Sequence, residues 1–126
     1  MLDGNLGSGK TVFVQGLAKG LGINPRMVRS PSFALIQEYH GNPPLCHADL
    51  YRLSFAEIAN LGLEEYWKSE NWIAAIEWAE KAGKLVPSSA LKIRFKMISK
   101  NIREITFTGN KKWKNILKQL SKQKKF

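Results

Sequence analysis

The sequence has few of the features that mark secreted or membrane proteins. Its 126 residues include one cysteine, Cys46, so no disulfide can form within the chain, and such sparse cysteine is typical of a reducing compartment. No apolar run approaches the roughly 20 residues that a membrane-spanning helix needs. At the start, Asp3, Asn5 and several glycines stand where a signal peptide would have its apolar segment. We therefore expect a cytoplasmic protein without a membrane partner.

Acidic residues are almost missing from the last third of the chain. Residues 1–83 carry seven basic and nine acidic side chains, whereas residues 84–126 carry thirteen basic and one acidic, Glu104. The net charge of +10 therefore comes wholly from the C-terminal end. A polyanionic partner would explain this asymmetry, and so would a basic surface that is merely solvated.

Composition and periodicity indicate an α/β fold. Hydrophobic residues make up 44% of the chain and charged residues 24%, which is ordinary for a globular domain. Helical periods predict helices at about residues 10–21, 54–62 and 63–68, and Ser54 with Glu57 three residues on predicts a capping box at the start of the second. Alternating or continuous apolar runs predict strands at residues 33–39, 45–49, 72–77, 91–97 and 102–108. Helices and strands alternate first and a hairpin follows, so we expect a mixed sheet flanked by helices.

The chain divides at about residue 110. Residues 1–110 hold the predicted sheet and its helices. Residues 111–126 are expected to form a basic amphipathic helix or tail, with Trp113, Ile116 and Leu120 on one side. This second segment could lie against nucleic-acid phosphates or an acidic partner face, or against solvent alone.

A phosphate-binding loop is the clearest motif. Residues 4–11, GNLGSGKT, fit the pattern G-x-x-x-x-G-K-[ST]. Glycines let backbone N–H groups converge on phosphate oxygens, and the helix that follows points its positive end at the same anion. The alternative is a glycine-rich turn with an incidental lysine. The pattern predicts an ATP or ADP site made by Asn5, Leu6, Gly7, Ser8, Gly9, Lys10 and Thr11.

The residues before this loop are few. A phosphate loop normally follows a buried strand, yet only residues 1–3 precede Gly4. A missing central strand removes apolar burial worth roughly 1.5–3 kcal/mol per side chain. That loss rivals the whole stability of a domain, about 5–15 kcal/mol. We therefore expect that the first strand is truncated and that the true start lies upstream, or that another segment covers the gap.

Two carboxylates stand at predicted strand ends. Asp49 closes residues 45–49 and Glu77 closes residues 72–77. In open α/β sheets the ligand crevice lies at the carboxyl ends of parallel strands, where such groups can hold Mg²⁺ and orient water. Alternatively, Asp49 caps a turn and Glu77 is a solvated strand end. His47 is expected to be structural, because no second histidine or cysteine cluster accompanies it.

Several motifs in a fixed order carry a family resemblance. They are the phosphate loop at 4–11, SPSF at 30–33, HADLYR at 47–52, LGL at 61–63 and IEW at 76–78. Over about residues 4–105 this order resembles the bacterial TsaE (YjeE) ATPases, which take part in the threonylcarbamoyladenosine modification of tRNA. The resemblance implies a small P-loop fold. It also implies slow, Mg²⁺-dependent ATP hydrolysis that depends on a complex of TsaD and TsaB, with the threonylcarbamoyl transfer left to TsaD.

The resemblance also implies roles for individual residues. Lys10 and Thr11 correspond to the phosphate and Mg²⁺ residues. Ser32 takes the place of a threonine in a switch-like loop near the γ-phosphate. Glu77 and Asp49 correspond to the acidic pair, with Glu77 the stronger candidate for Mg²⁺ and Asp49 important for activity. Trp78 lies near the site, against nucleotide, a partner or the core.

Two other functions stay open from the sequence. The chain could be a non-catalytic module that uses a truncated P-loop domain and its basic end to bind partners or RNA. It could also be a small-molecule kinase, although no arginine-rich lid is visible. Of the aromatic residues, Trp67 and Trp72 are expected to be part of the core.

Overall fold

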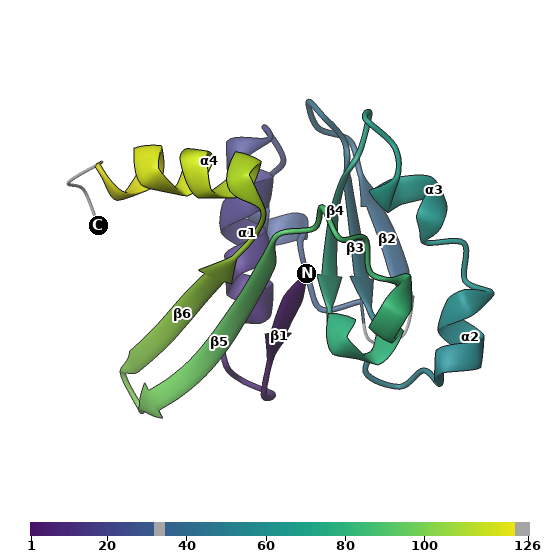
Figure 1. Ribbon diagram of the computed structural model, residues 1–126, viewed down its shortest axis with the longest axis horizontal. Coiled ribbons are helices and arrows are strands. Elements are labelled where there is room, and N and C mark those ends of the chain that lie inside the picture. The colour runs from purple at the N-terminus through teal and green to yellow at the C-terminus, as the bar shows by residue number, and fades with distance from the viewer. Residues whose placement is uncertain (32–34, 123–126) are drawn as a thin grey trace.

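A six-stranded mixed sheet forms the centre of the molecule, in a computed structural model that describes residues 1–31 and 35–122 (Figure 1). The strands lie in the order β2-β3-β4-β1-β5-β6. Their bounds are β1 Leu2–Gly4, β2 Ile36–Tyr39, β3 Leu45–Asp49, β4 Ile73–Glu77, β5 Lys92–Ser99 and β6 Ile102–Thr108. The four inner strands are parallel, and β2 and β6 run antiparallel at the two edges. The α/β class with a mixed sheet is confirmed.

Helices cover both faces of this sheet. Their bounds are α1 Lys10–Gly20, α2 Phe55–Ala59, α3 Glu64–Trp67 and α4 Lys111–Ser121, with 3₁₀ helices η1 Pro25–Met27 and η2 Ala79–Leu85. The predicted capping box is present, since the Ser54 hydroxyl accepts a hydrogen bond from the Glu57 N–H at 3.2 Å. The helix that it starts is shorter than expected. The η2 turns lie in a segment where the sequence patterns predicted neither a helix nor a strand.

The core consists of two apolar clusters, one on each face of the sheet. On one face, Val14 and Ala18 of α1 pack against Leu45, Ala75 and their neighbours. On the other face, the segments α2 and η2 close over a second cluster, formed by Ala48, Leu50, Leu53, Ile58, Leu63, Ile76, Ala79 and Ala82. Adjacent residues of β3 and β4 therefore alternate between the clusters, as the period of two requires.

The first strand is present but short. β1 lies between β4 and β5, paired with β5 at three positions and with β4 at one, where Leu2 is opposite Glu77. The Leu2 carbonyl accepts from the Trp78 N–H at 2.9 Å, and the Met1 carbonyl accepts from the Ile93 N–H at 2.8 Å. The first strand is therefore not absent, but it has three residues, which agrees with the expectation of a truncated strand. These few residues pair with both neighbouring strands and lead straight into the loop.

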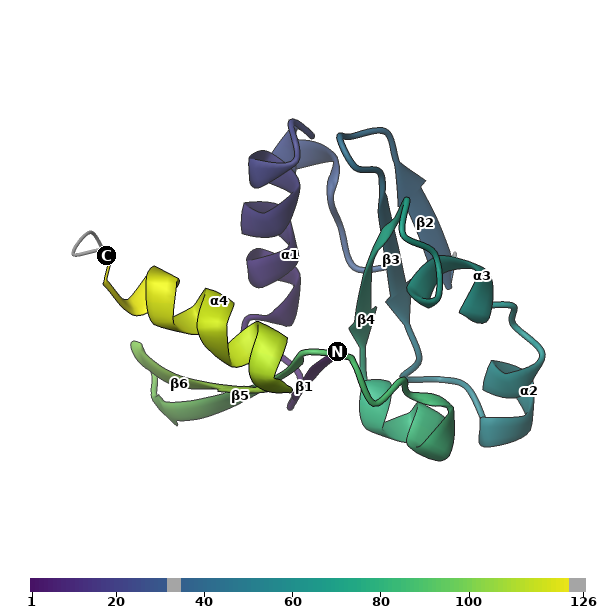
Figure 2. The ribbon, with the colours of Figure 1, turned by 45° about the horizontal axis from the view of Figure 1, so that its top comes forward.

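The C-terminal part stands apart from the rest. In Figures 1 and 2, the β5–β6 hairpin and α4 extend away from β2, β3 and β4 and from the helices beside them. The expected basic helix begins at Lys111. A hydrogen bond from the Trp113 Nε1 to the Ser89 carbonyl, at 2.7 Å, connects it to the segment before β5. Among the described residues, no helix is long and apolar enough to cross a membrane. Trp67 and Trp72 are half-buried, as expected.

Candidate functional site

The phosphate loop connects β1 to α1 through a run of unusual backbone angles. Gly7 and Gly9 have φ values of 75° and 108°, which favour glycine because it has no Cβ. At Gly4 a side chain is excluded for lack of space, because a Cβ there would lie 2.7 Å from the Phe95 carbonyl oxygen. The first turn of α1 carries no acidic residue. The N-cap residue, Gly9, makes no side-chain hydrogen bond to this turn either. The N–H groups of the first turn therefore form a positive helix end that suits an anion.

Lys10 is held inside this loop. Its Nζ donates to the Gly4 carbonyl and, at 3.1 Å, to the Asn5 carbonyl, and it lies 4.4 Å from the centre of the Trp78 ring. Burial lowers the pKa of Lys10, while the carboxylates of Glu77 and Asp49 act to raise it. The ammonium group thus contacts loop carbonyls and an aromatic face, and it lies in the electrostatic field of two carboxylates.

The alternation of the sheet brings the two predicted carboxylates to one place. β3 and β4 are parallel, and Asp49 is directly opposite Glu77 in their register. Side chains two residues apart share a face, so His47 lies on the same face as Asp49, and that face is the one that α1 covers. Both carboxylates are buried, with 8% of Asp49 and 3% of Glu77 exposed. The alternative of a solvated strand end for Glu77 is therefore wrong.

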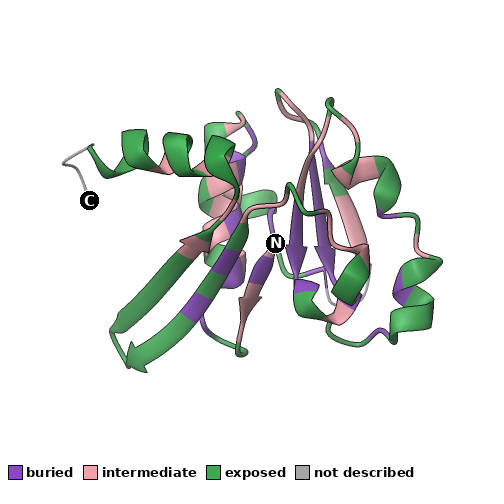
Figure 3. Cartoon of the chain, in the orientation of Figure 1, coloured by how far each residue is buried: buried purple, intermediate pink, exposed green. Residues whose placement is uncertain are grey.

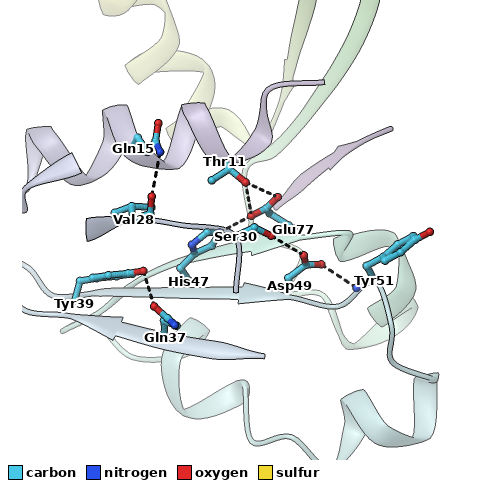
Figure 4. A network of polar contacts seen from close by, with 10 residues as sticks. All are labelled: Thr11, Gln15, Val28, Ser30, Gln37, Tyr39, His47, Asp49, Tyr51 and Glu77. Atoms are coloured by element: carbon cyan, nitrogen blue, oxygen red, sulfur yellow. Dashed lines mark hydrogen bonds and ion pairs between the residues drawn. The ribbon is translucent and has the colours of Figure 1, made fainter. Parts of the chain in front are cut away.

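Glu77 is the centre of a polar network (Figure 4). The Thr11 hydroxyl lies 3.4 Å from each of its carboxylate oxygens. The Nε2 of His47 lies 2.5 Å from Oε2. Asp49 has other partners, because its Oδ1 accepts from the Tyr51 N–H at 3.0 Å and its Oδ2 accepts from the Ser30 hydroxyl at 3.4 Å. The contact of Asp49 with the Tyr51 N–H is the turn that the sequence allowed, and it coexists with a place in the site.

A cleft of about 480 Å³ opens where these groups meet. Nine of the predicted site residues line it, namely Leu6, Gly7, Ser8, Gly9, Lys10, Thr11, Asp49, Glu77 and Trp78. Asn5 contributes its carbonyl to Lys10. The predicted role of Ser32 falls outside the described residues. The cleft is also lined by Val12, Ser30, Tyr51 and Arg52, for which the sequence had suggested no role.

One of these unpredicted neighbours, Tyr51, has a geometric explanation. The Tyr51 and Trp78 rings lie 4.8 Å apart between centroids, so the segments after β3 and β4 meet beside the cleft. Trp78 has a left-handed backbone with φ 56°, a conformation that costs a non-glycine residue about 1–3 kcal/mol. This turn directs the chain sharply away just after Glu77. The HADLYR motif could have pointed to Tyr51 from the sequence alone, whereas the contact between Tyr51 and Trp78 is visible only in the folded chain.

The donor set fits a magnesium ion bound together with a nucleotide. Mg²⁺ prefers oxygen ligands and is usually held by one or two carboxylates, substrate phosphates and water. Thr11 and Glu77 present a hydroxyl and a carboxylate side by side. Across the described residues, no group of three or more His, Cys, Asp or Glu side chains forms a metal site by itself. In addition, the buried Ser8 hydroxyl of the loop lacks a hydrogen-bond partner within the described part of the chain. The site therefore suits a phosphate-bearing ligand better than a bare ion.

Comparison with known proteins gives relatives of one description. A family model for "Threonylcarbamoyl adenosine biosynthesis protein TsaE" matches residues 1–105. A Bacillus subtilis protein named tRNA threonylcarbamoyladenosine biosynthesis protein TsaE is 44% identical over 109 residues, covering 86% of this chain and 67% of that protein. A Treponema pallidum protein of the same name is 38% identical over 107 residues, covering 84% of this chain and 78% of that protein.

The relatives are longer than this chain. A Nostoc protein, again named TsaE, is 52% identical over 85 residues, which cover 64% of this chain and 52% of that protein. The chain thus spans between about half and two thirds of the curated relatives from Nostoc and Bacillus. The crystal structure of Bacillus subtilis YdiB superposes with a TM-score of 0.76 at 38% identity, covering 95% of this chain and 74% of that one. A match that runs from the first strand into the last one, on a fold shared with a solved structure, means that this chain belongs to the TsaE family, as its motifs indicated.

Proposed function

We propose that this chain binds ATP with Mg²⁺ in the cleft and hydrolyses it slowly, in support of the threonylcarbamoyladenosine modification of tRNA. One observation carries the proposal. The phosphate loop, Lys10, Thr11 and Glu77 converge on a single cleft although Glu77 is 66 residues from Thr11 in sequence. The relatives' name supplies the pathway.

Each side chain has a part in binding. The N–H groups of the loop and of the first turn of α1 would bind phosphate oxygens. Lys10 would exchange the carbonyls of Gly4 and Asn5 for the β- and γ-phosphates. Thr11 and Glu77 would hold Mg²⁺, which when bound neutralises the charge that develops on the phosphates. Asp49, oriented by the Tyr51 N–H, is the second carboxylate and would position water. Trp78, which lines the cleft, is proposed to lie beside the nucleotide, and Ser32 is proposed to take part in hydrolysis.

The proposal includes dependence on partners. Hydrolysis by the isolated chain would be slow and would rise in the presence of the TsaD and TsaB complex, which would perform the transfer itself. A cytoplasmic setting goes with this role.

Calorimetry of MgADP and MgATP binding tests the proposal directly. Lys10→Ala should abolish binding, because the phosphate charge then has no side-chain partner in the loop. Lys19→Ala, an exposed lysine of the same helix, is the matched control and should bind as the unchanged chain does. Binding that survives Lys10→Ala, or ATP hydrolysis that the partner complex fails to raise, would contradict the proposal.

A second candidate function rests on the exposed basic side chains of the C-terminal part. Lys92, Arg94 and Lys96 are exposed along β5, and α4 exposes Lys114 and Lys118 with no acidic residue of its own. This surface could bind RNA without nucleotide chemistry. Such binding to tRNA would weaken steeply with salt and with Lys114→Gln plus Lys118→Gln, and it would be indifferent to Lys10→Ala.

A further inference from the structure

We infer that His47 is a positioning residue for Mg²⁺ binding: its imidazole holds the Glu77 carboxylate in the orientation that presents it to the ion. The inference rests on the proposed function and adds a residue to it. His47 does not line the cleft, so it would act through Glu77 and not by touching the nucleotide.

The fold places this ring behind the carboxylate. His47 is in the middle of β3, paired with Ala75, and it lies two residues before Asp49 on the face that carries Glu77. It is fully buried, with 0% of its surface exposed. Its Nε2 is 2.5 Å from Glu77 Oε2, closer than the roughly 2.7–2.9 Å usual between a nitrogen donor and a carboxylate, so the ring and the carboxylate are in direct contact. Figure 4 shows the ring on the side of Glu77 away from Tyr51.

The surroundings of the other ring nitrogen, Nδ1, indicate which nitrogen of His47 carries the proton. Nδ1 is buried and has no hydrogen-bond partner within the described residues. A neutral imidazole has one N–H donor and one lone pair, and a buried N–H without an acceptor is the costlier of the two to leave unpaired. The proton therefore belongs on Nε2, where Glu77 accepts it. His47 can then donate to Glu77 from Nε2 without leaving a buried N–H unpaired at Nδ1.

This arrangement divides the carboxylate between two tasks. The His47 ring contacts Oε2 alone, whereas the Thr11 hydroxyl lies 3.4 Å from both oxygens, so Oε1 carries no contact from the ring and faces the side where Thr11 would share the ion. Outer groups that orient a metal ligand in this way commonly contribute 10–100-fold to metal affinity. A ring that merely filled space would be replaced by leucine without any effect on the metal.

The test compares nucleotide binding with and without Mg²⁺ in two variants. His47→Leu keeps the apolar volume and removes the donor, and His47→Gln returns an N–H donor on a flexible side chain. Cys46→Ala, at a neighbouring buried position that faces the other way on β3, is the matched control. Calorimetry would measure ADP affinity in excess chelator, and then the Mg²⁺ concentration that gives half of the full increase in affinity.

We expect His47→Leu to raise that Mg²⁺ concentration about tenfold or more while ADP affinity in chelator stays unchanged. His47→Gln should restore most of the effect, and Cys46→Ala should show none. Equal Mg²⁺ dependence in His47→Leu and the unchanged chain would overturn the inference, and so would a loss of ADP affinity that is the same with and without Mg²⁺. If the unchanged chain binds no nucleotide, the proposed function itself fails and this inference falls with it.

A spectroscopic measurement checks the hydrogen bond without any nucleotide. In ¹H–¹⁵N spectra of the imidazoles, His47 should carry its proton on Nε2, and its signal should move in Glu77→Leu. The exposed His40 is the internal reference and should not move. A proton on Nδ1 of His47, or a His47 signal that ignores the Glu77 substitution, would contradict the inference.

Discussion

The two ends of the sheet differ sharply in how they use their side chains. From β1 to η2 the chain packs two apolar clusters around the sheet, and it buries Lys10, His47, Asp49 and Glu77. Beyond Ala82, the described residues contribute just Ile93 and Phe95 to the buried core. Figure 3 shows this contrast, with most buried residues on the inner strands and exposed residues along the hairpin and α4.

The difference between these two regions indicates where function and stability are concentrated. Burying ionisable groups is expensive, so they persist where a rigid sheet supplies partners for them. The hairpin and α4 carry charge at the surface and leave apolar side chains such as Ile102 and Ile116 exposed, at 57% and 44%. Exposed apolar and basic side chains contribute little to folding, which leaves them free for contacts with other molecules.

Truncating one side chain in each region would test this contrast most strongly. Leu45→Ala, at a fully buried site, should lower the free energy of unfolding by about 2–5 kcal/mol, because it leaves a cavity. Ile102→Ala in the hairpin should change it by no more than about 0.5 kcal/mol. Urea unfolding measures both, and similar losses in the two variants would break the comparison.

Removing one negative charge from each region tests whether the two regions also differ in their importance for activity. Glu77→Gln should lower partner-stimulated ATP hydrolysis by on the order of 100-fold, about 2.7 kcal/mol of transition-state stabilisation. Glu104→Gln, which removes the acidic residue of the hairpin, is the matched control and should leave the rate unchanged. Hydrolysis rates with the partner complex present provide the measurement. A Glu77→Gln variant that retains most of its rate would show that the buried carboxylate is structural.

Removing a helix cap from each region gives a smaller effect. Ser54→Ala breaks the capping box of α2, which packs on the core through Ile58, and should cost about 1 kcal/mol of global stability. Asn110 caps α4 by accepting from the Trp113 N–H at 3.2 Å. Asn110→Ala should instead fray α4 locally, with faster amide exchange there and an unchanged unfolding midpoint. A global loss from Asn110→Ala would mean that α4 folds cooperatively with the sheet.

The pH dependence of stability is expected to be the smallest of these effects, because Glu80 is exposed and solvent screens its charge. Partial burial and a hydrogen bond with Asp3 raise the pKa of Glu80 from 4.5 to about 7. The folded chain therefore binds this proton more tightly than the unfolded chain does. The stabilisation is complete below pH 4.5 and is lost as the pH rises through about 7. Glu80→Gln should raise the melting temperature at pH 8 relative to pH 4, compared with the unchanged chain. Melting curves at both values check this, and parallel shifts in the two proteins would refute it.

Sequence patterns predicted much of the fold and most of the candidate site. The loop at residues 4–11, the capping box at Ser54, the hairpin and both strand-end carboxylates are local features. Each depends on backbone preferences or periodicity within a few residues, which is why the sequence alone carries them. The family resemblance followed from the order of these short motifs.

The tertiary structure decided the rest, because it depends on which residues meet across the sheet. The parallel register of β3 and β4 brings His47 to Glu77, 30 residues away, and no local pattern marks that contact. The place of the short β1 depends on the backbone groups of β4 and β5 that it pairs with, not on its own length. Sequence therefore determined which elements and chemical groups the protein has. Packing determined which of those groups are buried together, since burial depends on neighbours that the chain supplies from distant positions.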